Sequence, residues 1–181
     1  MRILKLPIAL LLSLLLFSSC DLIEDQLDAL EIKTALTHEE AVSVPASHDQ
    51  NVVLRHVVNL SLENNTSLEG KLDLIEAIEI SKMTIEFANF SGDANSKVNI
   101  KILFDGEELA DLNDVLLLDS SLNSQVYDLG SPEILSVLAD RILEDKSADL
   151  ELIMALNSGQ YDADFDLKIS LQIKTSVLNL I

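Results

Sequence analysis

Apolar and polar side chains alternate along several stretches of the chain. In residues 51–63 one parity is mostly apolar and the other mostly polar, and the same alternation recurs in residues 97–104 and 165–177. A shorter run of this kind covers residues 30–36. A period of two is typical of a β-strand with one buried face. The run at 165–177 is long for one strand, so we expect a bend or a bulge within it.

One helix is predicted after Ser131. A serine is a good N-cap, Pro132 suits the first helical position, and Glu133 suits the positive end of the helix dipole. The apolar residues that follow at helical spacing are Ile134, Leu135, Leu138 and Ile142. A weaker helical turn is indicated over residues 68–77, although Gly70 lowers the helix propensity there.

Residues 83–104 and residues 150–177 each contain two apolar runs separated by a Ser-Gly pair, and we expect each segment to be a hairpin. A shift that places Ser91-Gly92 on Ser158-Gly159 also superposes the apolar positions that follow. A helical segment is predicted before each of them. The match is compatible with an internal duplication, although it is mostly a match of pattern. The alternative, that any two hairpins with Ser-Gly turns align this well, stays open.

These elements predict a mainly β fold. Short strands with turns, one or two short helices and no repeated βαβ rhythm indicate an antiparallel β-sandwich, with an α+β two-layer domain as the alternative. We expect residues 29–181 to form this single β-rich domain. Irregular loops are predicted at residues 37–49 and 64–69, and the apolar run at residues 115–118 predicts a buried strand.

The first 20 residues have the parts of an export signal. Arg2 and Lys5 make a basic start, and residues 6–17 form an apolar run interrupted by one serine. That run is too short to span a bilayer, which needs about 20 apolar residues. The small residues Ser18-Ser19 follow it, directly before Cys20.

The segment Leu16-Phe17-Ser18-Ser19-Cys20 resembles the lipobox of bacterial lipoproteins, although Phe17 stands where that family usually has leucine. The resemblance covers these residues alone. It implies that residues 1–19 are a signal peptide, that Cys20 receives the lipid, and that residues 20–28 are a lipidated tether. Such proteins carry two or three acyl chains, and two chains anchor stably. We therefore expect a membrane anchor in the cell envelope, in the outer rather than the inner membrane. Asp21 fits either inner-membrane retention or surface export, so the leaflet stays open.

Charge then limits the partners. Without residues 1–19, which carry Arg2 and Lys5 and no acid, the formal charge changes from −19 to −21. This value argues against nucleic acid, whose binding depends on cations that neutralise phosphates. It also argues against electrostatic docking on anionic lipid. Cys20 is the only cysteine, so no intramolecular disulfide can form.

Three acids are weak candidates for a metal site. Asp162, Asp164 and Asp166 have the 1, 3, 5 spacing of a calcium loop, but Leu167 and Ile173 stand where an EF-hand needs glycine and glutamate. A solvated acidic start of a strand is the favoured interpretation. We therefore expect no metal and no cofactor.

No histidine or nucleophile arrangement indicates an enzyme. His38, His48 and His56 lack zinc-ligand spacing, and His56 is interpreted as a hydrogen-bonded histidine of the core or sheet edge. There is no Gly-x-Ser-x-Gly motif. The sequence thus favours a non-enzymatic envelope lipoprotein with a structural or protein-binding domain and an envelope protein as partner. A carrier of an apolar ligand and a calcium-dependent adhesion module are the alternatives.

Overall fold

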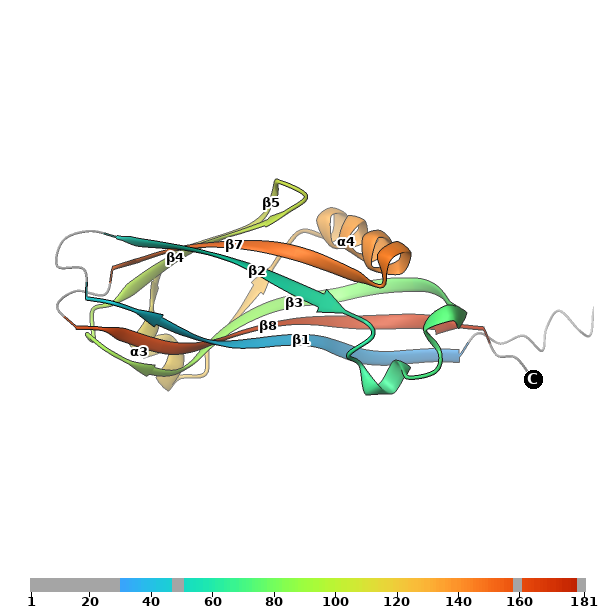
Figure 1. Ribbon diagram of the computed structural model, residues 1–181, viewed down its shortest axis with the longest axis horizontal. Helices are drawn as coiled ribbons and strands as arrows, with labels where there is room; N and C mark the ends of the chain where they lie inside the picture. Colours follow the sequence, from blue (N-terminus) through green and yellow to red (C-terminus); the bar gives the residue numbers. More distant parts are fainter. Residues whose placement is uncertain (1–29, 47–50, 158–160, 179–181) are drawn as a thin grey trace, which may run out of the picture.

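In the described part of the computed structural model, eight strands form two four-stranded sheets that face each other (Figure 1). The structure describes residues 30–46, 51–157 and 161–178. Every strand pair is antiparallel, which confirms the predicted antiparallel β-sandwich. The strands are β1 (Leu30–Val44), β2 (Val52–Ser61), β3 (Ile75–Ser91), β4 (Lys97–Phe104), β5 (Glu107–Leu116), β6 (Val126–Leu129), β7 (Ser147–Asn157) and β8 (Ala163–Val177).

The strand order identifies the topology. One sheet has the order β1-β8-β3-β6 and the other has the order β2-β7-β4-β5. The chain therefore crosses from one sheet to the other at every connection between consecutive strands except the β4–β5 hairpin. Eight strands in two sheets with these connections form a jelly roll. Aliphatic side chains from both inner faces fill the space between the sheets.

The two predicted hairpins are wrong. β3 and β4 lie in different sheets, and so do β7 and β8. A turn signal marks the end of a strand but does not say whether the next strand pairs with it or crosses to the other layer. The hairpin that the structure does contain at this point joins β4 to β5 through Asp105-Gly106, whose φ angles are 51° and 81°. Two positive φ angles and an Asp-Gly pair are the signature of a tight hairpin turn.

The sequence match between residues 83–104 and residues 150–177 coincides with a symmetry of the strand order. Strands β1 to β4 correspond, in order, to strands β5 to β8. Each strand lies in the opposite sheet from its counterpart and has the equivalent place in that sheet's strand order. Met83 pairs with Leu171 in the first sheet, just as Leu150 pairs with Phe104 in the second. Any chain with this strand order has the same relation between its strands, so the shared apolar pattern does not require a duplication.

The predicted irregularity of residues 165–177 belongs to the neighbouring strand. β8 pairs with β1 in one continuous register from Leu30↔Val177 to Val44↔Ala163. Its register with β3 shifts at three places, and each shift puts the extra residue in β3. β3 thus carries the bulges, which bend it along the sheet.

Helix α4 (Pro132–Asp145) confirms the helix predicted after Ser131. The Ser131 hydroxyl accepts a hydrogen bond from the backbone N–H of Ile134 at 3.4 Å, as an N-cap does. The buried side of α4 packs against β3 and β7, and Figure 1 shows it beside the sandwich. Its buried residues are Leu135, Leu138, Ala139 and Ile142. No helix among the described residues is long and apolar enough to cross a membrane.

Three local predictions need correction. Residues 37–44, predicted as a loop, continue β1. Residues 117–118, predicted as strand, begin helix α3 (Leu117–Leu122), where Leu117 is fully buried. The helical turn predicted over residues 68–77 is replaced by the 3₁₀ turns η1 (Thr66–Leu68) and η2 (Leu72–Leu74), after which β3 begins. In each case the run is short and its periodicity is ambiguous, so tertiary packing determines which structure it adopts.

Candidate functional site

The outer edge of β3 is only partly paired. β6 pairs with β3 at Met83–Glu86 alone, whereas β3 begins at Ile75. Within the described residues, no strand pairs with the part of this edge that precedes Met83, Ile75–Lys82. The reason lies at Gly130, where a φ of +80° turns the chain out of the sheet and into α4. A positive φ favours glycine because it has no Cβ.

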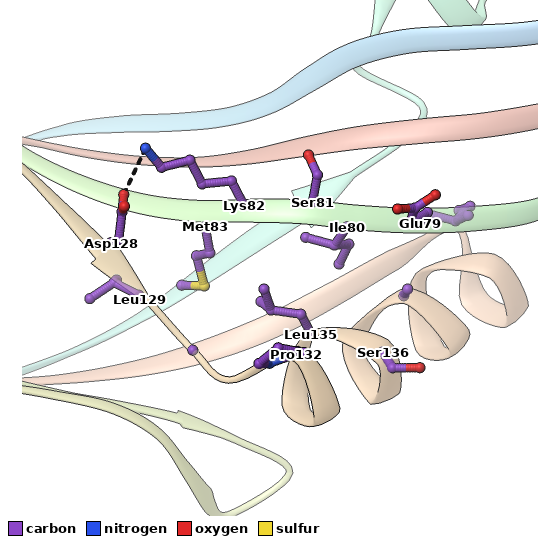
Figure 2. A pocket seen from close by; sticks show the side chains of 13 residues that line it. Glu79, Ile80, Ser81, Lys82, Met83, Asp128, Leu129, Pro132, Leu135 and Ser136 are labelled. Atoms are coloured by element: carbon purple, nitrogen blue, oxygen red, sulfur yellow. Dashed lines mark ion pairs between the residues drawn. The ribbon is translucent and has the colours of Figure 1, made fainter.

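A groove of about 600 Å³ lies between this edge and α4. Figure 2 shows β3 as one wall, α4 as the other, and the end of β6 closing one end. This volume is within the range of ligand-binding clefts, which are about 300–1,000 Å³. The lining residues are Ile78–Met83 of β3, Asp128–Gly130 at the end of β6, and Pro132, Leu135, Ser136 and Ala139 of α4.

The groove has an apolar interior and a polar rim. Ile80, Met83 and Leu135 line it and are buried or nearly so. On the rim the Lys82 ammonium lies 2.8 Å from the Asp128 carboxylate, and both side chains are partly exposed. An exposed ion pair of this kind contributes about 0–1 kcal/mol. The lining contains no histidine or cysteine, so its main binding groups are apolar side chains and the unpaired backbone of β3.

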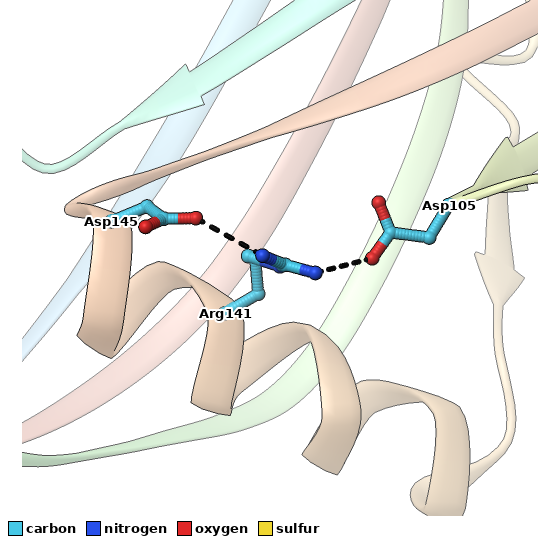
Figure 3. Close-up of polar contacts among 3 residues, drawn as sticks. All are labelled: Asp105, Arg141 and Asp145. Atoms are coloured by element: carbon cyan, nitrogen blue, oxygen red, sulfur yellow. Dashed lines mark hydrogen bonds and ion pairs between the residues drawn. The ribbon is translucent and has the colours of Figure 1, made fainter.

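Arg141 connects α4 to the β4–β5 turn of the second sheet through an ion pair. Its Nη2 lies 2.7 Å from Asp105 Oδ2 in the β4–β5 turn, and its Nη1 lies 3.3 Å from Asp145 Oδ2 (Figure 3). Hydrogen bonds to Asp105 and then to Asp145 raise the pKa of Arg141 above its ordinary value. The contact ties the outer wall of the groove to the second sheet.

The three predicted acids lie at the start of β8 and each accepts a hydrogen bond from the chain itself. Asp162 and Asp164 are exposed, and Asp166 is half-buried. Their donors are, in that order, the backbone N–H of Ala46, the hydroxyl of Ser43 and the side-chain amide of Asn89. In the described part of the chain, no three His, Cys, Asp or Glu side chains are grouped so that they could hold a metal ion.

Two of the histidines meet at a glutamate that the sequence prediction did not include. His56 Nδ1 lies 3.0 Å from Glu40 Oε1, and His38 Nε2 lies 3.6 Å from Glu40 Oε2. All three are half-buried and face inward from β1 and β2, the edge strands of the two sheets. The alternation along β1 could have indicated this cluster. Leu36 and Val42 face inward at even-numbered positions, and His38 and Glu40 occupy the even positions between them. The cluster joins the two sheets along one open side of the sandwich.

Two predicted residues lie outside the described residues. They are Cys20, the expected site of lipid attachment, and His48. The predicted signal peptide and tether, residues 1–28, also lie outside them.

No protein-family model matches the chain, and no curated protein matches its sequence. Among solved structures, the decameric BFDV capsid protein is 9% identical with a TM-score of 0.45, covering 81% of this chain and 99% of that one. FlhE is 7% identical with a TM-score of 0.40, covering 80% and 97%. The turnip yellow mosaic virus chain is 9% identical with a TM-score of 0.32, covering 84% and 97%. Similarities at these levels carry no information about function.

Proposed function

We propose that this protein is a membrane-anchored lipoprotein of the cell envelope whose β-sandwich is a non-enzymatic protein-binding domain. Residues 1–19 direct export, Cys20 carries the lipid, and residues 20–28 connect the lipid to the domain. The outer membrane is the favoured location. Two features support this proposal: the lipobox resemblance in the first 20 residues and the groove beside β3.

The groove is the observation that supports the proposed binding function. Open strand edges are usually paired, covered or shortened, because their free backbone groups attract other chains. Here α4 lies along the edge but leaves a cleft of about 600 Å³ beside it. An edge with an adjacent apolar cleft offers both backbone hydrogen bonds and side-chain pockets to a partner.

The anchor and the groove are compatible in distance. The described domain begins at Leu30. An extended chain reaches about 3.3–3.6 Å per residue, so the segment between Cys20 and Leu30 spans at most about 36 Å. Figure 1 shows α4 in the half of the domain that contains the start of β1. A tethered domain would therefore present the groove within a few nanometres of the membrane surface.

The anchor is tested by labelling cells with radioactive palmitate. We expect the wild-type protein to be labelled and Cys20→Ser to lose the label, because the thioether needs the cysteine sulfur. Asp21→Asn serves as the control, since it changes the neighbouring residue and should be labelled like the wild type. Equal labelling of Cys20→Ser and the wild type would refute the anchor.

The binding function is tested by chemical crosslinking in the native envelope, followed by purification of the protein. We expect a specific envelope protein to be crosslinked to the wild type and to be absent from a parallel preparation of an unrelated lipoprotein. A wild-type sample without any crosslinked partner would refute the protein-binding function.

A further inference from the structure

Resting on the proposed protein-binding function, we infer that the groove takes an extended segment of a partner protein that is rich in basic and aliphatic residues. The segment adds to the edge of β3 as a further strand and lies between β3 and α4. Three observations carry this inference: the unpaired edge, the apolar interior and the acidic surroundings.

The backbone sets the position of the segment. Neighbouring strands lie about 4.7–4.9 Å apart, so a strand in line with β6 would occupy the space beside Ile75–Lys82. The register of β3 shifts between Ile75 and Ala77 and again between Ile80 and Lys82. The regular stretch between these shifts is Ala77–Ile80. A segment of four to six residues therefore matches the available ladder.

The interior of the groove selects aliphatic side chains. Side chains alternate between the two faces of a strand, so every second residue of the segment would point toward Ile80 and Leu135. Both are apolar and nearly buried. Small or medium aliphatic residues at alternate positions fit this wall, while the intervening residues would point outward.

The charges around the groove select a basic partner. Glu79 lines the groove and is exposed, and two neighbouring lysines already have carboxylate partners. Lys82 of the lining is paired with Asp128, and Lys174, which lies opposite Glu79 in the sheet, is paired with Glu31. Glu133 and Asp140 are exposed on α4 at three and four residues from Ser136, so they lie on the same side of the helix. Outward-pointing lysine or arginine residues of the segment would meet these carboxylates.

The same charges disfavour two other occupants. The chain's own segment at residues 21–28 contains four acids and no base. The β3 edge of a second copy would bring Glu76 and Glu79 against the same residues. Like charges directly opposite each other in a sheet are destabilising. A basic segment from a different protein is therefore the occupant that the groove fits.

The inference is tested with a fluorescein-labelled six-residue peptide that alternates lysine and valine, by fluorescence anisotropy on the full-length purified protein. One comparison peptide has the same sequence with alternate backbone nitrogens methylated, and another has glutamate for lysine. We expect the first peptide to bind and the methylated one to bind at least about tenfold more weakly, since each methyl group removes a backbone hydrogen bond to the edge of β3. The glutamate peptide should not bind.

Matched variants place the peptide. Ser136→Trp fills the groove from its exposed rim, whereas Val137→Trp adds the same side chain at an exposed position of α4 that does not line the groove. We expect Ser136→Trp to weaken binding about tenfold or more and Val137→Trp to bind like the wild type. Glu79→Lys should weaken binding about threefold, as an exposed charge pair does, and Glu76→Lys, outside the lining, should change it less. Circular dichroism confirms that each variant is folded.

Several results would overturn the inference. Equal binding by Ser136→Trp and the wild type would place the peptide elsewhere, and equal binding of the methylated peptide would show attraction by charge alone. Self-association that Ser136→Trp abolishes would assign the groove to a second copy. An envelope partner crosslinked equally to the wild type and Ser136→Trp would leave the protein-binding function intact and remove the groove as its site.

Discussion

Replacing Gly130 by alanine tests the turn that creates the groove. Gly130 has a φ of +80°, and a Cβ there would lie 3.1 Å from Leu135 Cδ2 and 3.3 Å from Leu135 Cγ. Gly106 provides a matched control because its φ is +81° and a Cβ there would have no atom within 4 Å. The two alanine variants therefore share the backbone strain, and they differ in the contact with Leu135.

The expected magnitudes follow from this comparison. An L-residue in the left-handed region costs about 1–2 kcal/mol, and the stiffer unfolded chain offsets about 0.4–1 kcal/mol of that. Gly106→Ala should thus lower the free energy of unfolding by about 1 kcal/mol. Overpacking costs about 1–3 kcal/mol. Leu135 borders the open groove and can shift into it, so the overpacking cost should be at the low end of this range, about 1 kcal/mol. Gly130→Ala should therefore lower the free energy of unfolding by about 2 kcal/mol in total.

Urea unfolding followed by circular dichroism measures both values. We expect the two variants to have the same slope and Gly130→Ala to have the lower midpoint, by a difference of about 1 kcal/mol in unfolding free energy. Equal midpoints would refute the contact with Leu135. A wild-type midpoint for Gly106→Ala would refute the assumed strain. The Leu135 shift should also weaken binding of the lysine–valine peptide.

Two further predictions concern the core and the surface. Phe87 is fully buried, and its ring centroid lies 6.0 Å from that of Tyr127 and 5.9 Å from that of Phe165, both in edge-to-face geometry. Phe87→Ala should therefore lower the free energy of unfolding, measured in urea, by about 3–5 kcal/mol. A loss under about 1 kcal/mol would contradict this packing. A hydrogen bond from Lys174 lowers the pKa of Glu31, so Lys174→Met should raise that pKa towards its ordinary value in an NMR titration. The pair stabilises the fold above the ordinary pKa of Glu31, and this effect is lost as the pH falls through the lowered pKa. An unchanged titration would show that Lys174 does not contact Glu31 in solution.

Local patterns were sufficient to predict most of the elements. The alternation in residues 51–63, 97–104 and 165–177 corresponds to β2, β4 and β8, because one face of each strand is buried. The cap, the proline and the apolar spacing after Ser131 predicted α4 for equally local reasons. The β4–β5 hairpin was also within reach, since Asp105-Gly106 is a strong turn signal.

The groove and the histidine cluster depend on contacts between distant parts of the chain. The sequence predicts that a helix begins after Ser131, but it contains no sign that the strand before this helix pairs with β3. The cluster at Glu40 requires β1 and β2 to be neighbouring edges of opposite sheets. The sheet to which a strand belongs is a non-local property, so reading the segments 83–104 and 150–177 as hairpins was wrong while their strands were right.

The acidity of the protein gives the open edge its selectivity. A β-sandwich with an unpaired strand is at risk of pairing with its own copies. The formal charge of −19 for the whole chain opposes that pairing at every orientation, and Glu76 and Glu79 oppose it at the edge itself. The same repulsion is absent for a basic segment, for which the carboxylates become partners. Raising the salt concentration should therefore weaken binding of the lysine–valine peptide, because salt screens the attraction between its lysines and these carboxylates. Peptide binding that does not change with the salt concentration would mean that shape, and not charge, determines what enters the groove.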